Sequence, residues 1–337
     1  MKKIIFFLFT IAMISCSSDN DNENSALIEY DKVSTVAAGV FKPRDLYATA
    51  LTIDGNGNIY VASFESDQIR KVDKNGIVTV LAGSGEYSEI DVNGQGEEAV
   101  FTTIVDLNTD SKGNIYFSGS HDRTLRKITP DGLVTTYLTE AEMGRQAFGF
   151  LIDKEDNLYI SDAASILKFN PKGTSTILAG KPDAWGHNDG KGEEARFSSA
   201  QFIAKDSKGN LYLKENVGAE GIRKITPEGL VTTIKITVKQ DGVYVPYVGL
   251  EDAQGLAIDK NDIIYISTAN NNILQITPDG KGKYLLGEGD RPSGYKDGLV
   301  GEALTSNIGR IAFDENGDLI IIENRKNGIN VRKLSRK

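Results

Sequence analysis

The chain is poor in the side chains on which many catalytic and metal sites depend. Its 337 residues include one cysteine and two histidines. A single cysteine cannot close an intramolecular disulfide or build a cysteine zinc site, and two histidines cannot supply a three-histidine zinc centre. The formal net charge of −9 argues against the basic surface that non-specific nucleic-acid binding needs, so we expect no nucleic-acid partner.

Helical periodicity and long apolar runs are also missing. No segment repeats its apolar residues with the period of an amphipathic helix, and beyond the N-terminal region no apolar run is long enough to span a bilayer. No serine, histidine and acid are placed as a triad would require, and no glycine-rich segment follows a strand and opens a helix as a phosphate-binding loop does. These absences favour an all-β protein without an evident catalytic motif.

The N-terminal region has the pattern of an export signal. Two lysines precede an apolar run (4–14), which is followed by a small residue and then by Cys16. Segment 13–16 resembles a loose bacterial lipobox, in which the cysteine becomes the lipidated N-terminus. Together with the acidic tract 17–23, it is similar to the surface lipoproteins of Bacteroidota. The alternative is a cleaved secretory peptide with an incidental cysteine.

From this pattern we expect a signal peptide at 1–15, a tether at 16–32 and a globular body at 33–337. The resemblance implies a monomeric outer-membrane lipoprotein, exposed at the cell surface and held to the membrane through the lipid on Cys16 only.

The body repeats one short phrase six times, an acidic residue followed by a turn and a β-strand. Successive copies start between 43 and 56 residues apart, which indicates an array of similar units. The copies are DGNGNIYV (54–61), DSKGNIYF (110–117), DKEDNLYI (153–160), DSKGNLYL (206–213), DKNDIIYI (259–266) and DENGDLII (314–321).

Each unit reads as four short antiparallel strands, exemplified by 50–53, 59–62, 68–72 and 77–82, with Asp-rich and Pro-Asp-Gly turns between them. Radial repetition of such units predicts a six-bladed β-propeller. The sixth unit ends after its third strand, and the missing fourth strand is found near the N-terminus, where 33–39 is similar to 77–83 of the first blade. We therefore expect 33–39 to close the last blade.

The strand Gly-Asn-Ile/Leu-Tyr-Val, the hairpin Ile-Arg-Lys-Ile-x-Pro-Asp-Gly and the linker Asp-Gly-x-Gly-x-x-Ala-x-Phe together resemble the NHL-repeat family. The linker stands at 187–197, with variants at 91–101 and 295–305, and a different, longer segment replaces it at 236–248. The resemblance covers roughly 33–335 and implies the propeller fold. NHL-type propellers host binding, scaffolding and catalysis alike.

Strand alternation gives the ring two rims. One, the Asp-turn rim, carries the short turns of each blade. The other, the variable rim, carries the linkers and the connections between second and third strands, and recognition usually uses such variable loops. The residues that follow the six second strands on this rim are Ser63, Gly119, Asp162, Glu215, Thr268 and Glu323.

The three acids among them, Asp162, Glu215 and Glu323, could converge on a divalent cation at the channel mouth, with Asn216 and Asn324 as further ligands. They could instead cap turns or pair with nearby cations such as Arg123, Arg310 or Lys214. No other cofactor is expected.

The position four residues before each repeated aspartate brings charge near the axis in two blades, at Asp106 and Arg310. The arginine could hold a carboxylate or phosphate, or it could neutralise a neighbouring acid. Aromatic residues on the linkers, Tyr87, Trp185 and Tyr295, could bind a glycan or a protein partner, or pack against their own blades. The Arg-Lys pairs of the third strands are expected to pair with acids between blades.

We expect a binding or scaffolding propeller that recognises a protein, peptide or glycan on the variable rim. The tentative binding residues are Asp106, Asp162, Trp185, Glu215, Arg310 and Glu323. One alternative is a cation-dependent lactonase-like or lyase-like enzyme that uses the three acids at the channel mouth. The other is a purely structural envelope component.

The lipoprotein hypothesis is tested at its one cysteine. Cys16→Ala should release the protein from the membrane fraction, because no second lipidation site is available to hold it. Fractionation of cells followed by immunoblotting measures this. A variant that still sediments with membranes would show that the anchor lies elsewhere.

Overall fold

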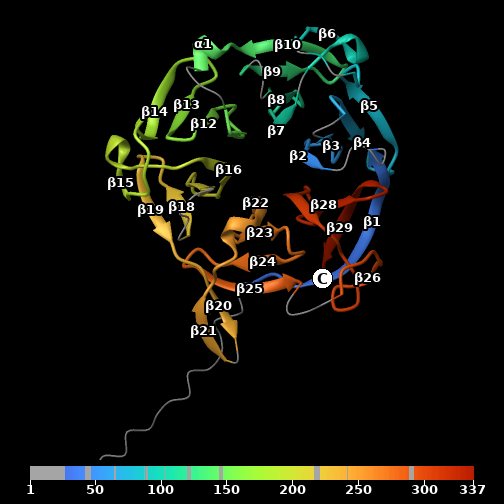
Figure 1. Ribbon diagram of the computed structural model, residues 1–337, viewed down its shortest axis with the longest axis vertical. Coiled ribbons are helices and arrows are strands. Elements are labelled where there is room, and N and C mark those ends of the chain that lie inside the picture. The colour runs from blue at the N-terminus through green and yellow to red at the C-terminus, as the bar shows by residue number, and fades with distance from the viewer. Residues whose placement is uncertain are drawn as a thin grey trace, which may run out of the picture.

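The structure is a computed structural model that describes residues 27–41, 47–63, 66–86, 88, 90–101, 103–119, 123–143, 147–215, 221–240, 242–287 and 292–337. They form six β-sheets around a central axis (Figure 1), which confirms the predicted six-bladed β-propeller. The proposed signal peptide and Cys16 lie outside the described residues. Within the described part, no helix is long and apolar enough to cross a membrane.

The blades are numbered one to six in the order of their inner strands, which face the axis. The inner strands are β2 (Ala48–Ile53), β7 (Ile104–Thr109), β11 (Gly149–Ile152), β16 (Ala200–Lys205), β22 (Ala253–Ile258) and β27 (Ile308–Phe313). The second strands are β3 (Ile59–Ser63), β8 (Ile115–Gly119), β12 (Leu158–Ser161), β17 (Leu211–Glu215), β23 (Ile264–Thr268) and β28 (Leu319–Arg325).

The outer half of each blade continues the antiparallel order. The third strands are β4 (Ile69–Val72), β9 (Leu125–Ile128), β13 (Ser165–Phe169), β18 (Ile222–Ile225), β24 (Ile273–Ile276) and β29 (Gly328–Arg336). The fourth strands are β5 (Val78–Ala82), β10 (Leu133–Leu138), β14 (Ser175–Gly180), β19 (Leu230–Ile234), β25 (Lys281–Leu286) and, in blade six, β1 (Tyr30–Phe41).

Apolar packing takes place between neighbouring blades. One core cluster combines Ala62 and Ile69 of blade one with Phe117 and Ile128 of blade two. A middle strand is therefore covered on both faces, and all five residues of β3 are buried. This explains why the second strands are β-branched and aromatic without a polar alternation.

The repeated aspartate has a structural role in each turn between first and second strands. In blade one, Oδ1 of Asp54 accepts the backbone N–H groups of Asn56 (2.9 Å) and Asn58 (2.8 Å). Its Oδ2 accepts the hydroxyl of Tyr60 at 3.0 Å. This Asx-type turn explains the spacing of Asp, Asn and Tyr in the repeated phrase.

Blade six is closed by the two ends of the chain, as predicted. Strand β1 pairs antiparallel with β29, with Val33 opposite Leu334 and Phe41 opposite Ile329. It begins at Tyr30, so the last residues of the predicted tether already belong to the sheet. The seam therefore leaves no open edge between the first and last parts of the ring.

Linker segments add further elements to the blades. Short strands β6 (Gly94–Gln95), β15 (Gly190–Lys191) and β26 (Gly298–Leu299) extend blades two, four and six. In blade five, the hairpin of β20 (Thr237–Gln240) and β21 (Val243–Pro246) takes this place, and β20 runs parallel to β25. Short helices α1 (Glu140–Met143), η2 (Gly96–Glu98), η3 (Gly192–Glu194) and η4 (Leu250–Asp252) lie in the connections.

Ring closure predicts a large effect of truncation. A chain that starts at residue 42 loses β1 and with it the fully buried side chains of Val33, Val40 and Phe41. Since each such side chain contributes about 1.5–3 kcal/mol, the melting temperature should fall by about 10 °C or more. A chain that starts at residue 27 is the control and should melt like the mature protein. Equal melting of both truncated chains would contradict the closure.

Candidate functional site

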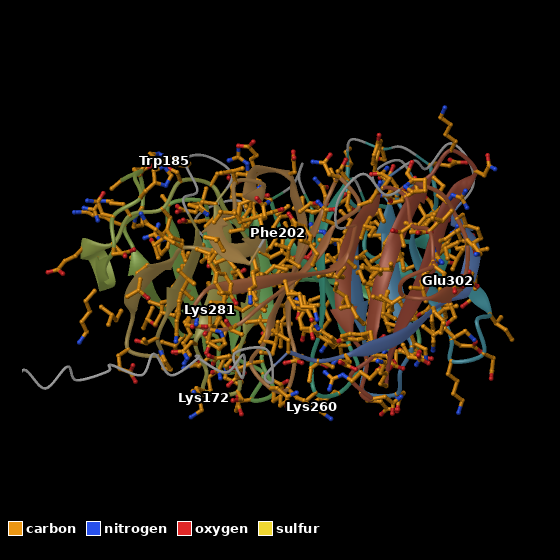
Figure 2. The ribbon with its side chains drawn as sticks, turned by 90° about the horizontal axis from the view of Figure 1, so that it is seen from below. Lys172, Trp185, Phe202, Lys260, Lys281 and Glu302 are labelled. Carbon is orange, nitrogen blue, oxygen red and sulfur yellow. The ribbon has the colours of Figure 1, made fainter. Side chains whose placement is uncertain are left out.

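The two rims lie on opposite faces of the ring, as the strand alternation predicts. Figure 2 shows Trp185, which belongs to the linker before blade four, on one face. Lys172 and Lys260 lie on the other, within the short turns of blades three and five. The Asp-turns and the turns between third and fourth strands therefore share one rim.

Buried arginines on the third strands hold the linkers of the variable rim. The guanidinium of Arg223 donates from Nη1 to the carbonyl oxygen of Arg196 (3.0 Å) and from Nη2 to that of Asn188 (2.9 Å). In the same way, the guanidinium of Arg332 donates from Nη1 to the carbonyl oxygen of Leu304 (2.8 Å) and from Nη2 to that of Lys296 (3.0 Å).

In blade two, Arg126 donates to the carbonyl oxygen of Val100 (3.0 Å) and to the side chain of Asn93 (2.7 Å). The side chains of Arg126, Arg223 and Arg332 are no more than 2% exposed. The same clamp therefore fastens the Asp-Gly-x-Gly linker in three blades.

Two of the predicted ligand acids complete these clamps. Glu215 accepts Nη1 of Arg223 at 2.7 Å and the backbone N–H of Ser198 at 2.5 Å. Glu323 accepts Nη1 of Arg332 at 2.7 Å and the backbone N–H of Ser306 at 3.2 Å. Burial raises the pKa of Glu323, although the Arg332 guanidinium opposes this shift.

The third acid caps its own turn. Oδ1 of Asp162 accepts the backbone N–H groups of Ala164 (3.1 Å) and Ser165 (2.6 Å). Asp162, Glu215 and Glu323 are thus each engaged within their own blade and its linker. Of the partners expected for them, Arg123 instead pairs with Glu140. Asn324 accepts the backbone N–H of Ala48, whereas Asn216 lies outside the described residues.

The structure does not bring the three acids together. Among the described residues, no group of three His, Cys, Asp or Glu side chains is placed to hold a metal ion. The expectation that they could share a cation at the channel mouth is therefore not supported by the geometry. The physical reason is that Glu215 and Glu323 neutralise buried arginines and Asp162 caps a turn, which are the roles that the sequence analysis gave as the alternative to metal binding.

The linker aromatics behave differently from one another. Trp185 is 58% exposed. The guanidinium groups of Arg325 and Arg332 lie 4.4 and 4.7 Å from the centre of the Tyr295 ring, and its hydroxyl lies 2.5 Å from that of Thr35. Tyr295 therefore packs against its own blade. Tyr87 lies outside the described residues.

Asp106 and Arg310 lie deep in the central channel. They line its inner end together with Phe202, which has a positive φ of 53°. The pairing of the inner strands is irregular beside all three residues, and such bulges redirect side chains. The guanidinium of Arg310 lies 4.3 Å from the centre of the Phe202 ring.

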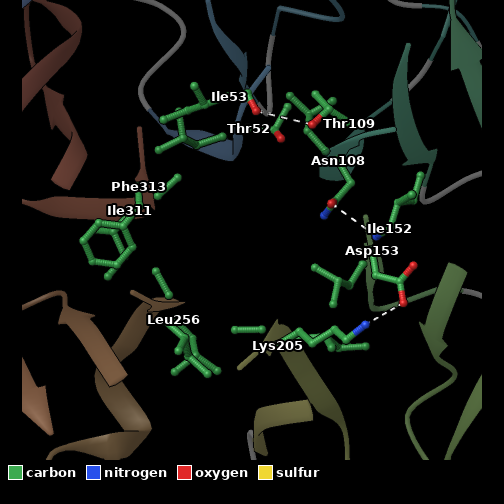
Figure 3. A pocket seen from close by; sticks show the side chains of 18 of the residues that line it. Thr52, Ile53, Asn108, Thr109, Ile152, Asp153, Lys205, Leu256, Ile311 and Phe313 are labelled. Carbon is green, nitrogen blue, oxygen red and sulfur yellow. Dashed lines mark hydrogen bonds and ion pairs between the residues drawn. The ribbon is translucent and has the colours of Figure 1, made fainter. Parts of the chain in front are cut away.

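The channel is a cavity of about 820 Å³ that runs out to the Asp-turn rim. Figure 3 shows apolar Leu256 and Phe313 on one side and polar Asn108 and Asp153 on another. Near the rim, Nζ of Lys205 lies 2.6 Å from Asp153. Burial acts to raise the pKa of Asp153, but Lys205 and the N–H groups of Asn157 outweigh it and hold that pKa low. The rim that the sequence marks as uniform therefore carries the mouth of the cavity.

Comparisons of the sequence with known proteins find a distant relative. No family model matches the chain. Teneurin-3 of Danio rerio is 24% identical over 240 residues, which are 63% of this chain and only 9% of that protein.

Solved structures with the same fold include a Bacteroides thetaiotaomicron protein of unknown function (TM-score 0.66, 15% identity, 91% of this chain and 76% of that one). A gluconolactonase of Xanthomonas campestris is also similar, with a TM-score of 0.61 and 11% identity over 94% of this chain and 93% of that one. A streptogramin B lyase has a TM-score of 0.58 and 14% identity over 91% of this chain and 98% of that one. At these identities the likeness concerns the six-bladed propeller alone.

The clamp in blade four predicts a strong effect of Arg223→Leu. The variant leaves the buried carboxylate of Glu215 without its guanidinium partner, with the N–H of Ser198 and the imidazole of His187 as its remaining contacts, so stability should fall by about 3–5 kcal/mol. Thermal and urea unfolding measure this, and the double variant Arg223→Leu/Glu215→Leu should recover part of the loss. Arg123→Leu, which breaks a pair whose side chains are about half exposed, is the control and should cost about 1 kcal/mol or less. Equal losses for the two arginines would refute the clamp.

Proposed function

We propose that this chain is a binding propeller, tethered to the cell envelope through Cys16, which recognises a protein, peptide or glycan on its variable rim. Trp185 is the anchor of this surface. The observation that carries the proposal is a large aromatic side chain that is 58% exposed on a linker held by a buried arginine. Exposed aromatic residues of this kind dominate many recognition surfaces.

The linker around Trp185 is fixed by many contacts. The backbone N–H of Gly186 donates to the carbonyl oxygen of Phe197 (3.2 Å), and Trp185 and Phe197 form a β-bridge. Beside them, Nδ1 of His187 lies 3.3 Å from Glu215. Because the backbone is already ordered, a ligand that stacks on the indole need not order the loop, and this preorganisation favours affinity.

The place where the tether leaves the ring supports the outward orientation of this surface. Tyr30, the first residue of β1, pairs with Arg336. Arg336 contacts the carbonyl oxygen of Gly317 and the carboxylate of Asp259, both in Asp-turns. A lipid on Cys16 would therefore hold the Asp-turn rim toward the membrane, with segment 17–29 spanning at most about 45 Å. Trp185 would face away from it.

The enzyme alternative has less support. It needs acids that are available to a cation, whereas Glu215 and Glu323 each contact a buried guanidinium at 2.7 Å. Withdrawing either carboxylate would leave its arginine buried without its charge partner, which is costly. The structural neighbours include a gluconolactonase and a lyase, but their likeness extends to the fold only.

Trp185 is also a built-in reporter of binding, because it is the only tryptophan in the chain. In the free protein its emission should be that of a solvated indole and should be quenched readily by acrylamide. Fluorescence titration with a panel of glycans and envelope peptides should find a ligand that shifts the emission and protects the indole from the quencher.

Substitution tests the same proposal independently. Trp185→Ala should weaken binding of that ligand by roughly 2 kcal/mol or more, as expected for an interface anchor, and leave the melting temperature unchanged. Ile177→Ala, an exposed apolar residue of β14, is the control and should bind normally. A ligand that binds Trp185→Ala as tightly as the natural protein would place recognition elsewhere.

A further inference from the structure

The central channel has the features of a second binding site, independent of Trp185. All six inner strands line the cavity of about 820 Å³, a size typical of small-molecule sites. Its lining residues run from the Asp-turns inward to the level of Asp106, Phe202 and Arg310, and none comes from the strand starts beyond them. These three residues therefore form the floor of the channel.

Arg310 is held in place without using all its donors. Its Nε donates to the carbonyl oxygen of Thr49 (2.6 Å) and its Nη2 to that of Val105 (3.2 Å), while the Phe202 ring supports one face. Among the contacts of the described residues, Nη1 has no hydrogen-bond partner. The guanidinium thus bridges blades six, one and two and still presents a donor at the cavity floor.

Asp106 offers the complementary charge. Its carboxylate accepts the backbone N–H groups of Leu107 (3.0 Å) and Phe150 (3.2 Å), which leaves each oxygen a further lone pair. No ion pair joins Asp106 and Arg310 within the described structure, so their charges act on each other through space. Burial raises the pKa of Asp106 and lowers that of Arg310, and in each case the opposite charge resists the shift.

A cation and an anion at one end of a cavity, each fixed by backbone groups and not joined directly, match a ligand that carries both charges. We propose that the channel binds a small zwitterion of the amino-acid class, with its carboxylate on Arg310 and its ammonium on Asp106. The ligand enters from the Asp-turn rim, and the apolar wall around Leu256 and Phe313 accommodates its side chain.

The alternative is that Arg310 acts only as a structural tie between three blades. This alternative predicts no ligand, whereas the zwitterion site predicts selectivity for both charges together. Because recognition at Trp185 lies on the opposite rim, failure at one site leaves the other untouched (Figure 2).

Calorimetric titration of the whole mature protein tests the proposal, with glycine, L-alanine and L-leucine as zwitterions. Acetate carries the anion alone and methylammonium the cation alone. At least one zwitterion should bind, and at least about tenfold more tightly than either single ion, which corresponds to 1.4 kcal/mol. No heat with any zwitterion, or equal affinity for acetate, would overturn the proposal.

Variants locate the site. Asp106→Asn keeps one of the two side-chain acceptors for backbone N–H groups and removes the charge, so it should lose the preference for zwitterions over acetate; circular dichroism checks that it folds. Arg310→Met should abolish binding, with circular dichroism as the check on folding. Lys172→Met, an exposed turn residue that is not among those lining the cavity, is the control and should bind as the natural protein does. Unchanged selectivity in Asp106→Asn would place any bound amino acid outside the channel floor.

Discussion

The buried arginine of the third strand is the contact on which the rim depends. It is present in blades two, four and six, and each of these blades follows an Asp-Gly-x-Gly linker or its variant. Blades three and five have Leu167 and Leu274 at the same position, and the linkers before them lack that pattern. The coincidence within one chain has a physical cause, since a guanidinium without the linker carbonyl oxygens would be buried and unsatisfied. In blade one, Arg70 stands at this position without such a linker, is only partly buried and donates to the carbonyl oxygen of Val40 (2.7 Å). In blades two, four and six, arginine and linker therefore form one unit.

The two rims of the ring have different structural roles. On the Asp-turn rim, side-chain carboxylates satisfy the turns, and the N-terminal strand leaves from this side. On the variable rim, the linkers are irregular in sequence but fixed by the arginine clamps, so they can differ in surface chemistry without loss of order. This division supports a propeller that faces its partner with the linker rim, while the channel opens on the opposite face and offers a separate, smaller site.

Sequence reasoning predicted the fold and the closing strand because both depend on local patterns that repeat. The exposure of Trp185 and the packing of Tyr295 were left open, since both residues stand in similar linkers and differ only through their neighbours. The acids were harder to interpret. Asp162 and Glu215 occupy equivalent positions, yet one caps a turn and the other pairs with a buried arginine. That difference depends on one residue of the third strand, Leu167 in blade three and Arg223 in blade four, which is visible in the sequence. The position of Arg310 deep in the channel was not visible in the sequence, because it depends on contacts of its side chain with blades one and two.

The central claim is that the arginine clamp makes the linker a preorganised recognition surface. Time-resolved fluorescence anisotropy of the single tryptophan measures this directly, because it separates local motion on the nanosecond scale from tumbling of the whole protein. We expect Trp185 to tumble mainly with the whole protein and to gain a large fast component of the anisotropy decay in Arg223→Leu. A dominant fast component in the natural protein, or no change in the variant, would contradict it.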